Sequence, residues 1–424
     1  MHRKHEKERL LTPRLRFPEF RDAGEWEDMP LAEAASPVTD RATNGDGDTV
    51  LTLSAEHGVI AQDAYFDKKV AGNDVKRYIK IVLDDFVYND RTTKAYKYGT
   101  IKKLSVHQCG IVSPIYKCFR FNPEEIPVFW EWYFESGVHI SQLHKIINEG
   151  AKEGRFNISI QQFLSTTVYR PDKIEQQKIA DSLSSLDERI TVETRKLDAL
   201  KAHKKGLLQQ LFPAEGETLP RLRFPDFQDA GEWEERTLSQ LGELVSGLTY
   251  SPDDVRDNGL LVLRSSNIQN GMIVLDDNVY VRPEIGSANP SEPNDILICV
   301  RNGSKSLIGK NALIPEGMPP CTHGAFMTVF RSRSAKFVIQ LFQTETYESQ
   351  VSIGLGATIN SINGNQLKKY KFFVPKPDEQ QRIADCLSSL DDLIAVQTQK
   401  TELLKVHKKG LMQQLFPVLD EAQA

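Results

Sequence analysis

Apolar residues recur at alternating spacings of four and three over two long stretches of the chain. The first stretch carries Ile179, Leu183, Leu186, Ile190, Leu197, Leu200, Leu207 and Leu211, and the second carries Ile383, Leu387, Leu390, Ile394, Leu404, Leu411 and Leu415. An apolar period of 3.5 residues over about five heptads predicts two coiled-coil helices, each with a narrow seam. Polar residues occupy a few seam positions, namely Glu193 and Lys204 in the first stretch and Gln397, Thr401 and Lys408 in the second.

These two stretches are near-copies of each other. Residues 174–213 return as residues 378–417, and each copy ends in Leu-Phe-Pro, where the proline is a helix stop signal. A preceding segment, residues 13–31, also returns as residues 220–238, with Pro18 and Pro225 arguing against helix there. The chain therefore contains an internal duplication, which predicts a pseudo-twofold arrangement.

The two long helices are expected to bury their seams on each other in antiparallel pairing. Helices of about 38 residues run roughly 57 Å. With aligned ends the polar seam positions meet in a defined register: Glu193 against Gln397, Lys204 against Leu387 and Lys408 against Leu183. The polar layer at mid-length would fix the register, while the lysines extend to solvent. A parallel, in-register pair would instead place Lys204 against Lys408, and like charges in a seam repel.

The regions between the repeated segments have diverged, but four pairs of similar sequences remain. They are 50–60 with 261–273, 84–90 with 294–302, 125–136 with 334–345, and 156–171 with 358–375. The first, second and fourth pairs predict short strands bounded by Gly and Asn. The third predicts an amphipathic helix. The fold class is therefore α/β, with two mixed α/β globular domains separated by two long antiparallel coiled-coil helices.

The predicted division of the chain follows the repeat. It runs through an N-terminal tail and repeated segment (1–31), a first domain (32–170), a first long helix (171–213), a linker and repeated segment (214–238), a second domain (239–373), a second long helix (374–417) and a C-terminal tail (418–424).

Composition narrows the class of protein. The formal net charge of −5 excludes a uniformly basic nucleic-acid coat but not local basic faces. Five scattered cysteines without zinc spacing indicate reduced thiols in a cytoplasmic protein. No apolar run approaches the roughly 18 residues of a membrane span, and the charged N-terminus lacks the apolar region of a signal peptide.

The chain resembles the specificity subunits of type I DNA restriction–modification systems along nearly its whole length. The most specific features are the duplicated helices, which open with Glu-Gln-Gln-Lys-Ile-Ala and Glu-Gln-Gln-Arg-Ile-Ala and continue into Ser-Ser-Leu-Asp. Residues 110–120, 294–304 and 357–384 are also of the kind seen in that family.

That resemblance implies a DNA-binding subunit of a bacterial or archaeal complex. Each globular region would be a target recognition domain that reads one half of a split double-stranded DNA site, and the paired helices would set the unread spacer. Two modification subunits would dock on the helices and repeated segments, bind S-adenosylmethionine and methylate adenine at N6. Two restriction subunits, which use ATP and Mg, could join them. The chain itself would hold no cofactor and no metal.

Under this resemblance, candidate DNA-binding residues follow from charge and hydrogen-bonding capacity. Residues 61–110 contain ten Lys or Arg against six Asp or Glu. Cations suit phosphates, while forked donors and amides suit base edges. The candidates are Lys68, Lys69, Lys76, Arg77, Arg91, Lys94, Lys97, Lys102 and Lys103 in the first domain and Arg264, Asn267, Arg301, Asn302, Lys305 and Lys310 in the second. Asn267, Arg301 and Asn302 are the better suited to reading bases, and a solvated charged face is the structural alternative.

Candidate partner-binding residues are the apolar side chains at the helix ends and in the repeated segments. They are Phe17, Phe20, Trp26, Leu211, Phe212, Phe224, Phe227, Trp233, Leu415 and Phe416. Packing against the chain's own domains is an equal alternative, because one set of residues can serve both purposes.

Two other functions stay open at this stage. One is a single-chain methyltransferase or nuclease, but Ser113-Pro114-Ile115-Tyr116 lacks the second proline of the amino-methyltransferase loop, and no glycine-rich cofactor loop precedes it. We therefore read 113–116 as a structural turn and expect no catalytic residues. The other is a coiled-coil scaffold without a role in DNA binding.

Overall fold

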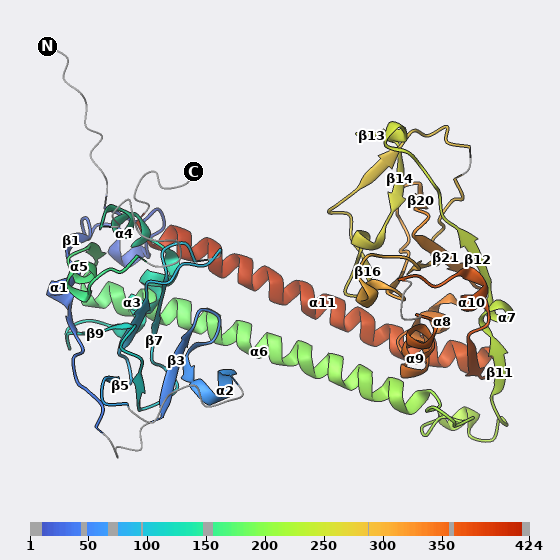
Figure 1. Ribbon diagram of the computed structural model, residues 1–424, viewed down its shortest axis with the longest axis horizontal. Helices are drawn as coiled ribbons and strands as arrows, with labels where there is room; N and C mark the ends of the chain where they lie inside the picture. Colours follow the sequence, from blue (N-terminus) through green and yellow to red (C-terminus); the bar gives the residue numbers. More distant parts are fainter. Residues whose placement is uncertain are drawn as a thin grey trace, which may run out of the picture. The chain divides into compact units, whose positions relative to one another are not determined.

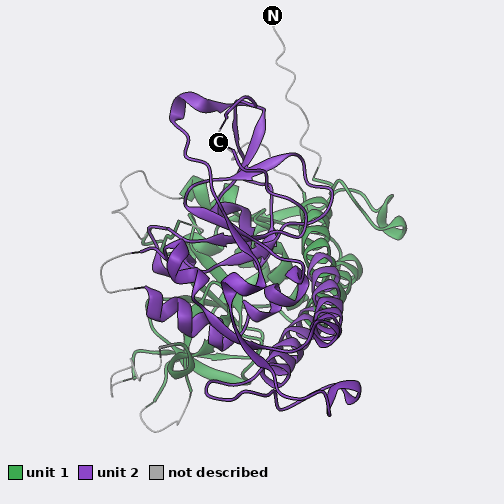
Figure 2. Cartoon of the chain, turned by 90° about the vertical axis from the view of Figure 1, so that its right-hand side faces the viewer, with its two compact units in different colours: residues 1–193, 400–424 green, residues 194–399 purple. Residues whose placement is uncertain are grey.

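The chain forms two compact units, each with its own core. The computed structural model describes residues 11–43, 49–66, 75–94, 96–146, 156–286, 288–355 and 360–417. Unit 1 comprises residues 1–193 and 400–424, and unit 2 comprises residues 194–399 (Figure 2). Within the described ranges, no helix has both the length and the apolar content that a membrane crossing requires.

The predicted long helices are α6 (Lys173–Leu211) and α11 (Pro377–Leu415), each of 39 residues (Figure 1). At 1.5 Å per residue each is roughly 58 Å long. Pro377 begins α11 at a position where a missing N–H is tolerated, and Pro213 and Pro417 follow the last turns. Both helices continue through the division between the units, so each unit contains one end of each helix.

Within each unit the two helices pair antiparallel, as predicted. In unit 1, Lys408 bonds to Asp187, and the Lys400 ammonium lies 2.5 Å from the Glu193 carboxylate. In unit 2 the Lys204 ammonium lies 2.5 Å from Asp391. The acidic partners Asp187 and Asp391 end the two Ser-Ser-Leu-Asp sequences, so each motif pairs with the lysine of the other copy.

The predicted surroundings of the seam lysines are wrong. Lys204 and Lys408 do not extend to solvent against leucines, because an aspartate one helical turn beyond the predicted neighbour neutralises each of them inside the seam. The Lys204 side chain is only 8% exposed and also donates to the Gln343 amide oxygen at 2.6 Å. Lys408 also lies over the Trp132 ring, 4.3 Å from its centroid.

The globular part of unit 1 is built on three antiparallel or mixed sheets with short helices. A two-stranded sheet pairs β1 (Glu27–Pro30) with β10 (Thr167–Arg170). A four-stranded sheet has the order β2 (Ala35–Pro37), β9 (Lys117–Phe121), β6 (Phe86–Asn89), β7 (Thr100–Lys103). Another has the order β4 (Gly58–Ala61), β3 (Val50–Ser54), β8 (Cys109–Val112), β5 (Ile79–Val82), and β3 and β8 run parallel. The helices are α1 (Leu31–Ala34), α2 (Gln62–Phe66), α3 (Pro127–Ser136), α4 (Ile140–Ile146) and α5 (Ile160–Leu164).

Unit 2 repeats this plan with different connections. β11 (Glu234–Thr237) pairs with β22 (Lys371–Val374), and a four-stranded sheet has the order β12 (Glu243–Ser246), β21 (Met327–Arg331), β18 (Ile296–Cys299), β19 (Asn311–Leu313). The second four-stranded sheet has the order β13 (Val255–Arg256), β17 (Val279–Val281), β14 (Leu260–Leu263), β20 (Cys321–His323), with β14 and β20 parallel. A small hairpin joins β15 (Ile268–Gln269) to β16 (Met272–Ile273), and the helices are α7 (Leu238–Leu241), α8 (Ala335–Leu341), α9 (Glu345–Gly354) and α10 (Gly364–Lys368). The two-stranded sheet and the first four-stranded sheet have matching strand orders in both units, which extends the duplication from the helices to the domains, whereas the second four-stranded sheet differs in order.

Three of the four predicted sequence correspondences have the expected structure, and the fourth is only partly right. The first two pairs contain strands, and the third forms α3 and α8. The fourth contains a short helix before its strand: α5 precedes β10, and α10 precedes β22. Ser159 and Asn363 cap these helices, with Gln162 and Gln366 completing reciprocal capping boxes that the strand prediction overlooked.

The core of each unit is completed by the end of the helix from the other repeat. In unit 1 the Phe416 ring, just after α11, lies 5.7 Å from Phe129 and 6.0 Å from Trp26, centroid to centroid. In unit 2 the Phe212 ring, just after α6, lies 5.6 Å from Phe337 and 6.2 Å from Trp233. Edge-on and tilted aromatic pairs at these separations are favourable beyond the area that they bury.

A buried arginine–glutamate pair fixes each repeated segment to the start of a long helix. Arg16 donates to both carboxylate oxygens of Glu175 at 2.7 and 2.6 Å, and Arg223 donates to both of Glu379 at 2.7 Å. The carboxylate bonds raise the pKa of both arginines above its usual range. The glutamate of each Glu-Gln-Gln motif is therefore structural, and this bidentate geometry is specific to arginine.

The first prediction concerns this pair. The Arg223 and Glu379 side chains are 13% and 2% exposed. Glu379→Gln leaves the Arg223 charge largely buried without its counter-ion, which is expected to cost about 3 kcal/mol of unfolding free energy. Urea unfolding followed by circular dichroism measures the change. The matched control is Glu235→Gln, which breaks the exposed pair with Lys371 and should cost under about 1 kcal/mol. Equal losses would contradict a structural role for the motif.

A second prediction concerns the seam. Burial lowers the pKa of Lys204, while Asp391 opposes that shift. Asp391→Asn should cost about 1–3 kcal/mol at pH 7, where a buried ammonium loses its charged partner. In this variant the pKa of Lys204 in the folded protein falls further below its value in the unfolded chain. The folded protein therefore releases the proton at a lower pH than the unfolded chain does. Its unfolding free energy rises with pH toward 10.5, the ordinary pKa of lysine. The deficit relative to wild type should therefore shrink between pH 7 and pH 10.

Unfolding free energies of both proteins at the two pH values check this expectation. Asp392→Asn, at the exposed neighbouring position, is the control and should leave stability unchanged. A deficit that grows with pH would show that Lys204 does not depend on Asp391.

Candidate nucleic-acid interface

Several predicted cations of unit 1 are exposed in loops beside the sheets. Lys76 and Arg77 precede β5, and Arg91, Lys94 and Lys97 lie between β6 and β7. All five are exposed and so can approach a phosphate backbone. Lys68 and Lys69 lie outside the described residues.

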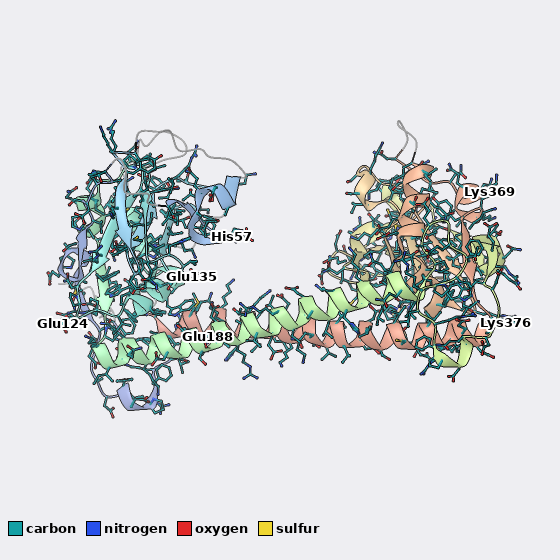
Figure 3. All side chains as sticks on the ribbon, turned by 90° about the horizontal axis from the view of Figure 1, so that it is seen from below. His57, Glu124, Glu135, Glu188, Lys369 and Lys376 are labelled. Carbon is teal, nitrogen blue, oxygen red and sulfur yellow. The ribbon has the colours of Figure 1, made fainter. Side chains whose placement is uncertain are left out.

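The two lysines of β7 have acidic partners within unit 1. The Lys102 ammonium lies 2.7 Å from the carboxylate of Glu135, which is labelled in Figure 3. Lys103 is buried and lies 2.8 Å from Asp84 and 3.7 Å from Glu131. Burial raises the pKa of Glu131, and the two lysines oppose that shift. Lys103 is therefore engaged inside the domain and is not presented to a ligand.

Asn267 in unit 2 is placed differently from the expectation for a base-reading residue. Its side chain is fully buried, accepts from the Arg264 backbone N–H at 2.9 Å and donates to the Val274 carbonyl at 3.0 Å. The Arg264 guanidinium lies 2.7 Å from Asp277. The amide of Asn267 therefore organises the connection between β14 and β16, because buried amides require such partners.

The loop after β18 presents polar groups at the surface. Arg301 is exposed, and its guanidinium lies over the Phe326 ring, 5.7 Å from the centroid. The Asn302 amide donates to Ser265 at 3.0 Å, and its oxygen accepts from the Ser304 backbone. Lys305 is exposed and Lys310 is half-buried. Phe326, 58% exposed, was not among the residues predicted from sequence.

A buried aspartate, paired with a partly exposed arginine, supports the equivalent strand in each domain. Asp85 accepts two bonds from Arg120 at 2.6 and 2.9 Å, and Asp295 accepts two from Arg331 at 2.8 Å. The preceding residues, Asp84 and Asn294, both have positive φ, of 70° and 68°. These pairs fix the strands from which the polar loops extend, and the matching Asp positions in 84–90 and 294–302 were their only trace in the sequence.

Most of the predicted partner-binding side chains pack inside the chain's own units. Phe20, Trp26, Leu211, Phe212, Trp233, Leu415 and Phe416 are buried. Phe17, Phe224 and Phe227 are only half-buried. Lys178 lies over the Phe17 ring and Arg382 over the Phe224 ring, 5.5 and 5.1 Å from the centroids. Phe17 and Phe224 therefore each lie beside a cation near the start of a long helix.

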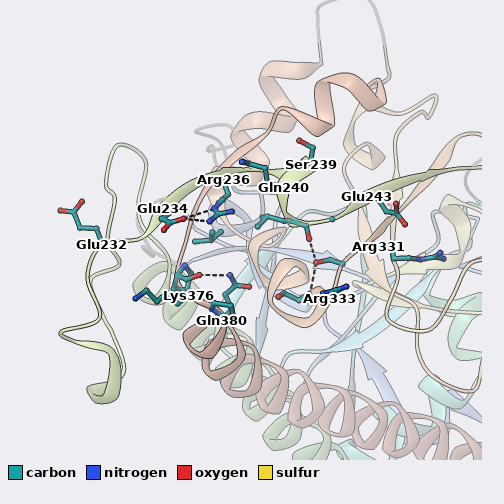
Figure 4. A pocket seen from close by; sticks show the side chains of 17 residues that line it. Glu232, Glu234, Arg236, Ser239, Gln240, Glu243, Arg331, Arg333, Lys376 and Gln380 are labelled. Atoms are coloured by element: carbon teal, nitrogen blue, oxygen red, sulfur yellow. Dashed lines mark hydrogen bonds and ion pairs between the residues drawn. The ribbon is translucent and has the colours of Figure 1, made fainter.

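A polar hollow of about 810 Å³ lies in unit 2 between β11, α7 and the start of α11 (Figure 4). Glu234 pairs with Arg236 at 2.5 Å on its wall, and Ser332 donates to the Leu241 carbonyl at 2.6 Å. A smaller hollow of about 390 Å³ occupies the equivalent place in unit 1, beside Arg170 and Gln176. None of the described residues lining either hollow is a cysteine or histidine.

Comparison with known proteins identifies the family. The profile described as "Type I restriction modification DNA specificity domain" matches residues 116–202 and 230–406, more than half of the chain. The chain belongs to this type I specificity family. Its model also shares the family fold: it aligns with the type I restriction–modification system S subunit from M. genitalium with a TM-score of 0.58 and 14% identity, covering 96% of this chain and 100% of that one.

Named relatives of the type I specificity family are similar over shorter regions. The StySPI specificity subunit of Salmonella potsdam is 29% identical over 184 residues, 41% of this chain and 39% of that protein. The EcoKI specificity subunit of Escherichia coli K12 is 30% identical over 168 residues, 37% of this chain and 36% of that protein. The alignments thus span less than two thirds of these relatives.

A third prediction separates structural from ligand-facing residues in this specificity domain. Asn267→Ala removes bonds to two buried backbone groups and should cost about 1–3 kcal/mol of unfolding free energy. Arg301→Ala, at an exposed side chain, should cost under about 0.5 kcal/mol. Thermal or urea unfolding of both variants measures the contrast. A larger loss of unfolding free energy for Arg301→Ala than for Asn267→Ala would contradict the structural role of Asn267 and the exposed role of Arg301.

Proposed function

We propose that this chain is the DNA specificity subunit of a type I restriction–modification complex, and that each globular domain binds one half of a bipartite double-stranded DNA target. The observation that carries the proposal is that the two units share a repeated internal architecture but have different surface loops. The order of the first four-stranded sheet, the ion pairs and the helix ends recur in both units, whereas the loops outside them differ. Two domains with the same architecture but different surfaces suit an asymmetric DNA site that is split into two halves.

The exposed residues divide by chemistry into two roles. Lys76, Arg77, Lys94 and Lys97 in unit 1 and Lys305 in unit 2 suit phosphate contacts, which position the protein without reading sequence. Arg301 suits base reading, because its planar fork matches the N7 and O6 acceptors of guanine in the major groove. Arg91, which follows β6 as Arg301 follows β18, is its counterpart in unit 1.

The paired helices are proposed to set the length of DNA left unread between the half-sites. The helices are held together by seam leucines and by lysine–aspartate pairs. A helix of roughly 58 Å corresponds to about 17 base-pair steps of 3.4 Å. Length along the helix would thus translate into spacer length together with the footprint of each domain.

Specificity subunits of type I restriction systems are non-catalytic, and the chemistry is proposed to reside in partners. Two modification subunits would bind S-adenosylmethionine and methylate adenine N6, and two restriction subunits with ATP and Mg could join. We propose that the modification subunits dock at the starts of the long helices, where Phe17 and Phe224 are half-buried beside Lys178 and Arg382, with Phe227 half-buried in the same repeated segment as Phe224. With DNA as ligand, the complex would act in the bacterial or archaeal cytoplasm.

The fourth prediction tests this function. Sequencing of methylated adenines in a host that expresses the chain with its modification partner should reveal one split motif with a fixed spacer. Deleting seven residues between Asp187 and Lys204 and seven between Asp391 and Lys408 keeps both lysine–aspartate pairs of the seam. This deletion shortens each helix by roughly 10 Å, so the spacer should shorten by about three base pairs or methylation should stop.

Each outcome bears on a different part of the proposal. Methylation at random adenines, or by the chain alone with S-adenosylmethionine, would refute a non-catalytic specificity subunit. An unchanged spacer after the deletion would refute the helices as its determinant. The Asp392→Asn variant, with intact helices, is the control for expression and assembly.

A further inference from the structure

Phe326 is an exposed aromatic residue in a rigid turn. It lies between β20 and β21 and is 58% exposed, which is unusual for a large apolar side chain that could turn inward. The backbone around it is held on several sides: Gly324 N–H bonds to Leu263, Ala325 N–H to Leu248, and Val300 and Arg301 N–H groups to the Phe326 carbonyl, at 2.8–3.1 Å. A fixed backbone with an exposed apolar side chain is arranged to meet a ligand without reorganisation.

Arg301 is positioned by the same turn. Its backbone N–H donates to the Phe326 carbonyl at 3.1 Å, and its guanidinium lies over one face of the Phe326 ring. The next residue, Asn302, is held through its side chain to Ser265, and Asn360 donates to the Gly303 carbonyl at 3.0 Å. A forked cation and an apolar ring are thus presented side by side from a loop with little freedom.

Unit 1 has an arginine and an exposed apolar residue at the equivalent positions of its own sheet. Tyr88 on β6 is opposite Lys117 on β9, as Ile298 on β18 is opposite Thr328 on β21. Two residues before these partners lie Ile115 and Phe326, so the two occupy equivalent positions. Ile115 is 44% exposed. Arg91 and Arg301 are likewise equivalent, each two residues beyond the end of the matching strand.

We propose that Phe326 and Ile115 are specificity-determining residues that pack against the methyl group of a thymine in the major groove. Each would act beside the base that the neighbouring arginine reads, Arg301 in unit 2 and Arg91 in unit 1. The inference rests on the proposed function and deepens it. Apolar side chains recognise thymine through its C5 methyl group, and arginine recognises guanine, so the pairing reads two adjacent positions of a half-site. The 113–116 turn, predicted to be only structural, would thereby have a second role at its exposed residue Ile115.

The test uses the complex of the full chain with its modification subunits, after its target has been mapped. Each thymine in the target is replaced singly by deoxyuridine, which removes only the methyl group. For the wild-type complex, one replacement in the half-site read by unit 2 should weaken binding about fourfold, the effect of losing one buried methyl group. Phe326→Ala should weaken binding to the unmodified target by at least as much and be insensitive to that replacement. Ile115→Ala should behave likewise in the other half-site.

The controls distinguish loss of a DNA contact from loss of folding, and failure of this inference from failure of the proposed function. Ile353→Ala removes a side chain that is 80% exposed on α9, outside this turn, and should retain wild-type binding and deoxyuridine sensitivity. Unfolding of Phe326→Ala should match wild type, and Phe326→Leu should restore part of the affinity. A wild-type complex indifferent to every deoxyuridine, or a Phe326→Ala complex that stays sensitive, overturns the inference. A wild-type complex without any preferred site overturns the proposed function instead.

Discussion

The packing of two phenylalanines at the ends of the long helices is the interaction on which the rest of the structure depends. Phe416 completes an aromatic core with Trp26 and Phe129, and Phe212 completes another with Trp233 and Phe337. In each case the helix belongs to one repeat and the domain to the other. The seam and the domain cores are therefore not separate sources of stability, because the same helices supply both.

Besides these phenylalanines, the interactions that the two repeats share involve buried side chains. The arginine–glutamate pairs hold the repeated segments, and the aspartate–arginine pairs hold the central strands. Buried charges tolerate little change, because losing one partner leaves the other uncompensated. Exposed loops carry no such constraint, and there the two units differ: Ile115 occupies in unit 1 the position that Phe326 has in unit 2, and unit 1 also exposes Lys76, Arg77, Lys94 and Lys97. This contrast is what the proposed reading of two unlike half-sites requires.

The parts of the fold that depend on periodic or duplicated sequence could be predicted. The seam of leucines specified both helices, and the repeated lysines favoured the antiparallel arrangement over a parallel one. The environment of Lys204 could not be predicted from the seam alone, because its partner Asp391 lies off the seam and approaches only in three dimensions. The short helices α5 and α10 were overlooked because their capping boxes outweigh a strand-like composition.

Candidate site residues were harder to predict, because residue type does not reveal exposure. The side-chain amide of Asn267 could hydrogen-bond to a base edge, but it bonds to buried backbone groups instead. Lys103 is likewise paired with acidic side chains of its own domain. Phenylalanine is typical of a core, yet Phe326 is exposed, because backbone hydrogen bonds hold its turn in place without packing of the ring. Only the folded arrangement distinguishes these cases.

The exchange of helix ends also dictates an order of events during synthesis. Unit 2 is assembled from one contiguous run, residues 194–399, whereas unit 1 needs residues 1–193 together with residues from 400 onward. Leu415 and Phe416 leave the ribosome more than 200 residues after most of the core that they complete. The core of the domain that is translated first therefore lacks Leu415 and Phe416 until all residues of unit 2 have been synthesised.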